Sequence, residues 1–189
     1  DRAVRSWVWK PMGLNGLTFR PVITEAPGTR DEAVAATEDS AWRGGVLQGQ
    51  VHDDNCWAMG GYSAHAGAFG TVREVLAFAR GWMGVPGESL GFITPRTRRA
   101  AWTRVSEPAG CERTLGWDTP TGAESSAGQH FCTGTVGHLG YTGTSLWIDP
   151  SAGVAIALLT NRVHPSREHI AIRAFRPKLH DAIREDLGR

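Results

Sequence analysis

The stretch "VGHLGYTGTSLWIDPSAGVAIALLTN", residues 136–161, decides the fold of this chain. Within residues 143–149, side chains alternate between two faces, which predicts a β-strand. One face carries Thr144, Leu146 and Ile148, and the other carries Ser145, Trp147 and Asp149. The segment "DPSAG" (149–153) is typical of a turn, and the apolar run at residues 154–161 predicts a second strand. The pattern therefore predicts an antiparallel hairpin with a tight connection.

Three glycines stand three residues apart in this stretch, at Gly137, Gly140 and Gly143. Glycine weakens a strand, so it indicates that another group comes close to the backbone. That group is either another strand or a substrate. From the residues alone, the simpler interpretation is a strand that tolerates glycine and in which His138 is a structural histidine.

Working outward, residues 71–84 give the clearest helical pattern. Thr71 and Glu74 form the T-x-x-E capping pattern. Apolar residues then recur on one face, at Val72, Val75, Leu76, Ala79, Trp82 and Met83. Residues 1–10 predict another helix, which Asp1 can cap, and a further helix starts near Thr94 with Pro95 in its first turn.

The remaining segments give weaker patterns. Residues 166–187 have helical spacing of apolar residues, interrupted by Pro177, where we expect a kink or a break. The apolar positions are Ile172, Phe175, Leu179, Ala182 and Ile183. Residues 114–119 predict a short strand. Residues 13–55 show no sustained period, and short helical turns are expected there, for instance at residues 30–37.

Composition limits the function classes. The chain has 189 residues, which suits one domain, and a net charge of +1, which gives no argument for a nucleic-acid partner. No apolar run approaches the ~20 residues that span a bilayer. Three scattered cysteines, Cys56, Cys111 and Cys132, are too few for a disulfide framework and form no C-x-x-C pair. One disulfide or three thiols both stay open.

Three segments, in order, resemble the second half of a known family. "GHLGYTGTSLWIDPSAGVAIALLTNRVHP" (137–165) is similar to the third active-site motif of the serine β-lactamase and penicillin-binding-protein-like hydrolases, with its two strands. "VHDDNCWAMGGYSAHAGAFGTVREVLAFAR" (51–80) resembles the preceding segment in the class C, esterase and D-aminopeptidase-like branch. "VRSWVWKPMGL" (4–14) resembles the helix that follows the family's second motif. The resemblance covers most of the chain.

The resemblance implies roles for six residues. His138, at the family's K-T-G or H-x-G position, would polarise the proton-transfer network in the cleft. The backbone N–H of Tyr141 would form half of an oxyanion hole, which needs a donor aimed at the developing charge. Gly140 would let the substrate lie along the strand. The resemblance also places Thr142, Gly143 and His65 among the substrate-binding residues; for His65, a structural role in a tightly packed loop is the alternative.

Two motifs of the family are missing. The nucleophile of the family lies in S-x-x-K, yet neither of the two lysines, Lys10 and Lys178, follows a serine by three residues. No Y-x-N or S-x-N second motif occurs either. We therefore expect the C-terminal portion of a longer hydrolase, with both motifs upstream. The expected fold is α/β (α+β), β-lactamase/transpeptidase-like, with an antiparallel sheet, a C-terminal helix packed on it, and part of a helical domain.

This portion is expected to be a single partial domain, 1–189. Residues 1–110 would form the helical and loop part, and residues 111–189 the sheet strands and terminal helix. The partner implied is the N-terminal portion of the same hydrolase.

Other patterns favour plainer interpretations. "GESLG" (87–91) matches G-x-S-x-G, but a helix and Pro86 precede it where that motif needs a strand. "VHDDN" (51–55) fits a polar turn better than a metal site. The two histidines of "HPSREH" (164–169) are five apart rather than four, which excludes the H-E-x-x-H zinc pattern. The basic run "RTRRAAWTR" (96–104) is typical of a solvated helix face.

The resemblance implies a serine hydrolase that forms and hydrolyses an acyl-enzyme on a small-molecule ester, peptide-like amide or β-lactam. It implies no metal and no organic cofactor. His138 and Leu139, where a K-T-G motif has lysine and threonine, favour an esterase or peptidase over a specialised β-lactamase. The alternative is a non-catalytic remnant that binds a peptide or a protein through its exposed sheet.

Overall fold

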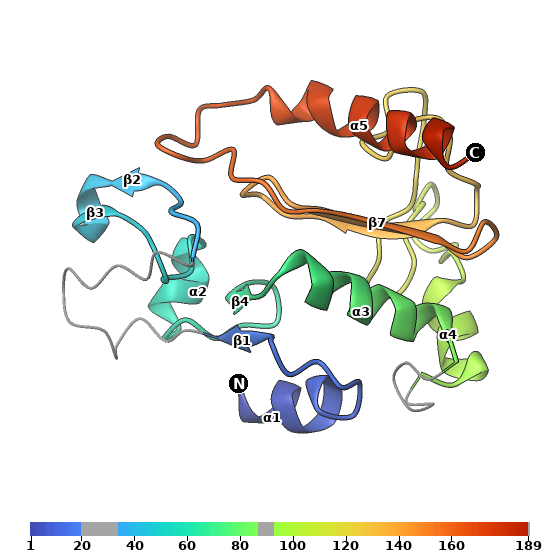
Figure 1. Ribbon diagram of the computed structural model, residues 1–189, viewed down its shortest axis with the longest axis horizontal. Coiled ribbons are helices and arrows are strands. Elements are labelled where there is room, and N and C mark those ends of the chain that lie inside the picture. Colours follow the sequence, from blue (N-terminus) through green and yellow to red (C-terminus); the bar gives the residue numbers. More distant parts are fainter. Residues whose placement is uncertain (20–33, 87–92, 189) are drawn as a thin grey trace.

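The main sheet lies between two helices. The computed structural model describes residues 1–19, 34–86 and 93–188 of the chain. Three antiparallel strands form the sheet in the order β5-β6-β7: Val136–Leu139, Ser145–Asp149 and Val154–Leu158. Helix α5 (Ile172–Asp186) covers one face and helix α3 (Val72–Met83) the other (Figure 1). The structure confirms the predicted α/β (α+β) fold with an antiparallel sheet and a C-terminal helix packed on it.

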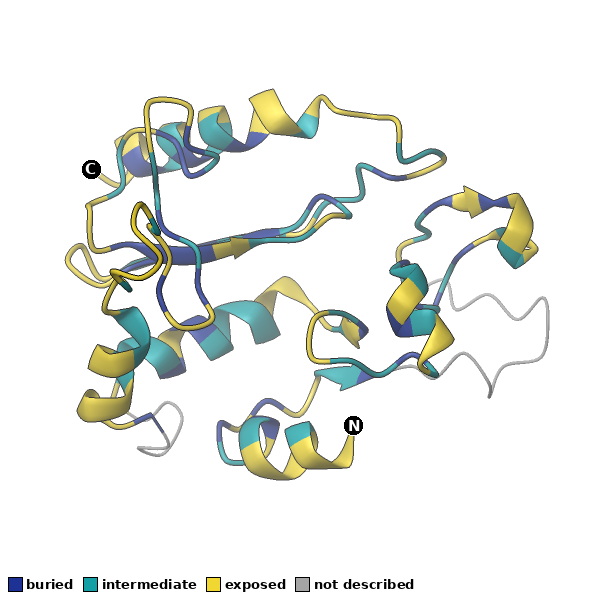
Figure 2. Ribbon diagram, turned by 180° about the vertical axis from the view of Figure 1, so that it is seen from behind, coloured by how far each residue is buried: buried dark blue, intermediate teal, exposed yellow. Residues whose placement is uncertain are grey.

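The predicted hairpin is confirmed. Strand β6 pairs with β7 from Ser145 opposite Leu158 to Asp149 opposite Val154. The two faces of β6 differ, as the alternation predicts: Ile148 joins the core cluster beneath α3, whereas Ser145 hydrogen-bonds to a side chain of α5. Both faces are covered, so the central strand appears as a buried layer in Figure 2.

Helix α3 forms as its sequence predicts. The Thr71 hydroxyl accepts a hydrogen bond from the Glu74 N–H, which caps the helix, and Gly84 ends it in the left-handed conformation. Ala79 lies fully buried against Val136 and Ile148 of the sheet. The burial of this apolar face stabilises α3 more than its intrinsic propensity does.

The other predicted helices are also present, with one difference. Helix α1 (Arg2–Val4) continues as a π-helical turn (Arg5–Trp9), and α4 (Pro95–Trp102) is capped by Thr94. Asp1 does not cap α1: its carboxylate accepts a hydrogen bond from the Arg5 side chain instead. Charge pairing across one helical turn replaces the expected cap.

Short elements complete the lobe beside the sheet (Figure 1). Helix α2 spans Asp54–Ala58. The two-residue strands pair as β1 with β4 and β2 with β3: Thr18–Phe19 with Ala68–Phe69, and Asp39–Ser40 with Gly45–Val46. The predicted turns at residues 30–37 lie partly outside the described residues, and residues 34–37 form no helix.

Two predictions about secondary structure are wrong. Residues 114–119 form no strand; they contribute only isolated bridges, including Asp118 opposite Gly137 of β5. Of the kink or break expected at Pro177, the break is wrong: helix α5 continues through this residue, although proline removes one backbone hydrogen bond at a cost of about 3 kcal/mol.

The fully buried residues of α5 are not its apolar ones. Phe175 is 48% exposed and Ala182 is exposed, whereas Ile172, Leu179 and Ile183 are half-buried. The buried residues are instead Arg176, His180 and Arg184, at spacings of four. This stripe faces backbone carbonyls and polar side chains, so hydrogen bonds contribute to holding α5 on the sheet.

Each residue of this stripe has defined partners. The Arg176 guanidinium donates to the carbonyls of Gly140 and Thr144, at 2.8 and 2.7 Å. His180 Nδ1 lies 3.0 Å from the Ser126 carbonyl and Nε2 lies 3.1 Å from the Ser145 hydroxyl. Because a carbonyl only accepts, Nδ1 carries the proton and the neutral ring accepts from Ser145 through Nε2. Arg184 forms an ion pair with buried Asp149, at 3.6 Å.

His180 predicts a loss of stability in mild acid. Burial lowers the pKa of His180 below its usual value. As the pH falls below about 6.5, the unfolded chain therefore binds a proton that the folded chain does not, and the free energy of unfolding decreases. Urea unfolding at pH 7.5 and 5.5 measures this slope. We expect it to flatten in His180→Gln and to persist in His169→Gln, which changes an exposed histidine. An unchanged slope in His180→Gln would refute the assignment.

No helix within residues 1–19, 34–86 or 93–188 combines the length and the apolarity that crossing a membrane requires.

Candidate functional site

The turn that follows β5 carries four of the six predicted site residues. The Gly140 N–H donates to the Thr144 carbonyl at 2.8 Å, and the Gly143 N–H donates to the Gly140 carbonyl at 3.1 Å. The Thr142 carbonyl accepts from the Arg162 N–H at 2.8 Å. The turn is thus closed on itself and joined to the segment after β7.

The structure gives internal reasons for all three glycines. A Cβ on Gly137 would overlap the Trp147 ring and the Leu146 carbonyl oxygen of the neighbouring strand, and a Cβ on Gly140 would overlap the Thr144 side chain. Gly143 has φ +118°, and a Cβ there would lie 2.7 Å from the Thr160 hydroxyl. Of the two explanations for glycine here, the close approach of the chain's own atoms therefore applies at all three positions.

His138 lies exposed on β5, opposite Leu146 of β6. Its Nδ1 lies 2.8 Å from the Leu139 carbonyl, so this nitrogen carries the proton and Nε2 is free of that bond. His138 thus keeps one ring nitrogen available on an exposed side chain, three residues before Tyr141. The role of His138 in proton transfer stays a prediction.

Tyr141 lies at the tip of the turn and is 60% exposed. Its carbonyl accepts a hydrogen bond from Arg162 Nε at 2.7 Å, and the Arg162 guanidinium lies over its ring, 4.2 Å from the centroid. The ring also stacks on His52, with the centroids 5.8 Å apart. No described residue accepts a hydrogen bond from the Tyr141 N–H.

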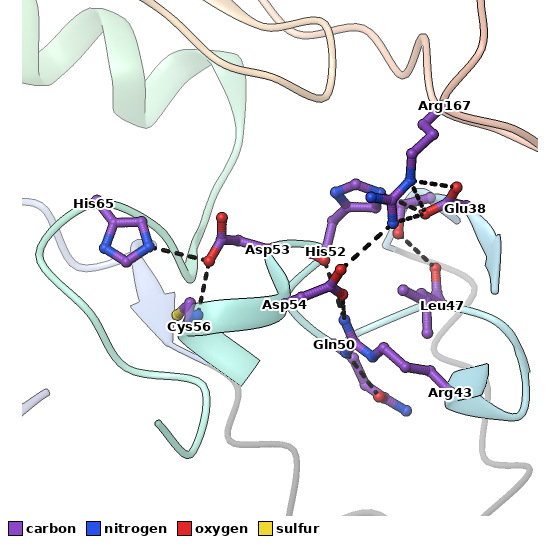
Figure 3. Close-up of polar contacts among 11 residues, drawn as sticks. Glu38, Arg43, Leu47, Gln50, His52, Asp53, Asp54, Cys56, His65 and Arg167 are labelled. Carbon is purple, nitrogen blue, oxygen red and sulfur yellow. Dashed lines mark hydrogen bonds and ion pairs between the residues drawn. The ribbon is translucent and has the colours of Figure 1, made fainter. Parts of the chain in front are cut away.

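A charged cluster lies beside this tyrosine, formed by Glu38, His52 and Arg167 (Figure 3). Arg167 Nε and Nη2 bind the Glu38 carboxylate at 2.5–2.9 Å, and His52 Nε2 lies 3.0 Å from the same carboxylate. The Arg167 hydrogen bonds and His52 outweigh burial and lower the pKa of Glu38 to about 2. Sequence reasoning missed this cluster, since its members are up to 129 residues apart.

Glu38→Gln is expected to lower the free energy of unfolding by about 2 kcal/mol at neutral pH, because it removes charge-assisted hydrogen bonds. The contribution of Glu38 is fully present above the usual carboxyl pKa of 4.5 and decreases as the pH falls toward about 2. Chemical denaturation at pH 7 and pH 3 measures both effects. Asp39→Asn, which removes an exposed charge next to it, should change little. Equal effects of the two substitutions would show that the cluster does not stabilise the fold.

His65, the remaining predicted site residue, makes contacts with Asp53 and Ser63 rather than with the turn after β5. Its Nε2 lies 3.0 Å from Asp53 Oδ1 and its Nδ1 lies 2.5 Å from the Ser63 hydroxyl. Asp53 also accepts from the Cys56 N–H and caps α2. Figure 3 shows His65 on the far side of Asp53 from His52. These contacts hold the loop after α2, and a substrate-binding role for His65 stays a prediction.

The residues of the motif "VHDDN" (51–55) make both local and long-range contacts. Asp53 makes the local backbone bond that the sequence predicts for a polar turn. Its neighbours His52 and Asp54 reach other segments: Asp54 forms ion pairs with Arg43 at 3.5 Å and Arg167 at 3.6 Å. This motif therefore links the short elements between Glu38 and Ala58 to the segment after β7.

The remaining candidates take no part in this site. Cys56, Cys111 and Cys132 are all free, and burial raises the pKa of the Cys56 thiol. Within the described parts of the chain, no three His, Cys, Asp or Glu side chains gather closely enough to hold a metal ion. The segment "GESLG" (87–91) lies outside the described residues.

Comparisons with known proteins agree on one family. A model of the beta-lactamase family matches residues 1–178. Putative D-alanyl-D-alanine carboxypeptidases of Salmonella agona and Salmonella typhi are 33% identical in an alignment of 183 residues, which covers 87% of this chain and 40% of each relative. The chain thus spans about two fifths of the length of these relatives.

Two solved structures share the fold. A beta-lactamase from Mycobacterium bovis aligns with a TM-score of 0.60 and 20% identity, over 98% of this chain and 55% of its own. Simvastatin synthase (LovD) from Aspergillus terreus aligns with a TM-score of 0.63 and 15% identity, over 98% of this chain and 50% of its own. At these identities the likeness shows the fold alone.

Proposed function

Because the chain belongs to the beta-lactamase family, we propose that it forms the C-terminal part of a serine hydrolase and supplies its oxyanion strand. The family resemblance drawn from residues 4–14, 51–80 and 137–165 is confirmed. At the level of the family, the match and the carboxypeptidase-named relatives support a serine hydrolase-type function. The site residues and the substrate of this chain belong to the proposal.

One observation carries the proposal: the Tyr141 N–H has no acceptor among the described residues, at an exposed turn whose carbonyls are bound. In the proposed reaction, a serine oxygen from the N-terminal portion attacks the carbonyl carbon of an ester, peptide-like amide or β-lactam. The carbonyl oxygen becomes an oxyanion, which the Tyr141 N–H stabilises by hydrogen bonding. The bond between the carbonyl carbon and the leaving oxygen or nitrogen then breaks, the leaving atom takes up the proton that the serine has lost, and water later hydrolyses the acyl-enzyme.

The other residues of the turn would bind and orient the substrate. Gly140, Thr142 and Gly143 present backbone along which an ester or amide can lie, and His65 borders the approach in this proposal. His138 would hydrogen-bond to the network that moves the proton, through the ring nitrogen that Leu139 leaves free. Neither a metal nor an organic cofactor is part of this scheme.

The N-terminal portion of the same hydrolase is the partner we propose. Among the described residues, strand β7 pairs only with β6, so its other edge offers N–H and C=O groups to a further strand. Exposed apolar side chains follow β7 in the chain, the last of them in α5: Leu159 (40%), Ile170 (61%) and Phe175 (48%). A strand and a helix of the missing portion would cover these groups.

The same exposed edge supports the second candidate function. A chain that acts alone could bind a peptide as an added strand beside β7, with Phe175 as an apolar contact. This binding module would need neither a nucleophile nor the Tyr141 N–H. The two functions therefore differ in whether any serine becomes acylated.

Labelling with a fluorophosphonate, followed by peptide mapping, tests the proposal. The probe is applied to this chain and to a form extended on the N-terminal side of Asp1. We expect label on the extended form alone, at a serine upstream of Asp1. Label on this chain itself, for instance at Ser89, would contradict the proposed division of the site. Label on neither form would favour the binding module.

A further inference from the structure

We propose that Arg162 and Arg176 are positioning residues that clamp the two peptide groups flanking Tyr141 and so aim its N–H at the reacting carbonyl. This inference rests on the proposed function. It adds two arginines that have no part in the proposed reaction as described above. Both act on the backbone of the turn, and neither contacts the substrate in this account.

Arg176 fixes the peptide group that carries the Tyr141 N–H. This arginine is 6% exposed and donates to the Gly140 carbonyl at 2.8 Å. In a trans peptide, the C=O of Gly140 and the N–H of Tyr141 point in opposite directions. A guanidinium that holds the carbonyl toward α5 therefore turns the N–H to the opposite side. The same bond polarises the amide and makes the N–H a stronger donor.

Arg162 fixes the next peptide group. Its Nε donates to the Tyr141 carbonyl at 2.7 Å, while Nη1 donates to the Arg167 and His169 carbonyls at 2.6 and 3.0 Å. The planar guanidinium thus joins three backbone carbonyls, a geometry that a lysine ammonium cannot reproduce. With one peptide group held by Arg176 and the other by Arg162, the backbone of Tyr141 has little freedom to rotate.

The charged cluster of Glu38, His52 and Arg167 holds the ring of the same residue. Arg162 lies over the Tyr141 ring, the ring stacks on His52, and His52 binds Glu38. Glu38 in turn binds Arg167, whose carbonyl accepts from Arg162. The contacts form a closed circuit around Tyr141, so each member limits the movement of the others.

The test measures acylation of the N-terminally extended protein by a chromogenic ester, p-nitrophenyl acetate. Arg162→Met should lower the acylation rate constant by about 10- to 100-fold, since a small misplacement of an oxyanion donor costs that much. The half-saturating ester concentration should change less than about threefold, because the substrate keeps its contacts. The acylation rate constant of Arg162→Lys should lie between those of Arg162→Met and the unmodified protein. Arg173→Met, on the exposed side of α5, is the matched control.

Three outcomes separate the claims. An unmodified protein that shows no acylation refutes the proposed function itself. An unmodified protein that is acylated, with Arg162→Met within twofold of Arg173→Met, refutes the positioning role alone. Circular dichroism checks folding; if Arg162→Met unfolds, Arg162→Lys and Arg176→Lys are compared instead. The proposal then requires both lysine variants to slow acylation at an unchanged half-saturating ester concentration. Rate constants equal to that of the unmodified protein would overturn it.

Discussion

Gly137→Ala is expected to disrupt the three-stranded sheet and to lower the free energy of unfolding by about 3 kcal/mol. The added Cβ would overlap the Trp147 ring and the Leu146 carbonyl oxygen. The ring cannot yield, since Trp147 is only 1% exposed and packs 6.3 Å from Phe131 between centroids. The strand cannot yield either, because Gly137 exchanges two backbone hydrogen bonds with Asp118 on its other side.

Urea unfolding followed by tryptophan fluorescence measures this loss. Gly134→Ala is the matched control: a Cβ there would meet only the Ser151 hydroxyl, at 4.0 Å, and the residue is exposed. We expect the control to unfold within about 0.5 kcal/mol of the unmodified chain. Equal midpoints for the two variants would show that β5 does not lie against Trp147 as described.

The sheet was predictable because its pattern is local. The alternation in residues 143–149 and the apolar run after the turn each reflect which face a side chain covers, and the structure confirms both. Helix α3 was predictable for the same reason, since Thr71 and Glu74 mark its start within one turn. Such patterns need no knowledge of distant segments.

The packing of α5 was not predictable in this way. A helix face with Arg176, His180 and Arg184 has the composition of a solvent-exposed face, yet the structure buries it. Burial is possible because the sheet and the preceding loop present acceptors, such as the Gly140 carbonyl and the Asp149 carboxylate. The Gly140 carbonyl lies 36 residues before Arg176 in the sequence, so no local pattern could predict this contact.

The candidate site divides along the same line. The turn with Gly140 and Tyr141 was singled out from its motif and its role stays a proposal, whereas the cluster of Glu38, His52 and Arg167 was not anticipated. Its three segments meet only in the folded chain, and the position of His52 beside two acidic residues suggested a local turn. One signal was available: a buried carboxylate requires a cationic partner, but the sequence offers 20 of them.

Tyr141→Pro is expected to slow acylation of the N-terminally extended protein by about 10²- to 10³-fold, the usual cost of one oxyanion donor. Proline has no N–H, so the substitution deletes the one group that the proposal requires at this position. The carbonyl that binds Arg162 is retained. Substrate contacts to the neighbouring residues are retained as well, so the loss should appear in the rate constant rather than in substrate binding.

Tyr141→Ala is the reference for this comparison. Like Tyr141→Pro, it lacks the ring that stacks on His52 and contacts Arg162, but it keeps the backbone N–H. Any effect of losing the ring and its hydroxyl therefore appears in the reference, and the ratio of the two variants reports on the N–H. Circular dichroism and unfolding midpoints establish that both variants fold.

The acylation rate constant of Tyr141→Pro relative to Tyr141→Ala, measured by stopped-flow release of p-nitrophenol, tests most directly whether this chain supplies the oxyanion strand. The account predicts a ratio of about 1/100 or lower, with the acyl group on a serine upstream of Asp1. A ratio near one in folded proteins would contradict it, because the charge of the tetrahedral intermediate would then be stabilised without the Tyr141 N–H.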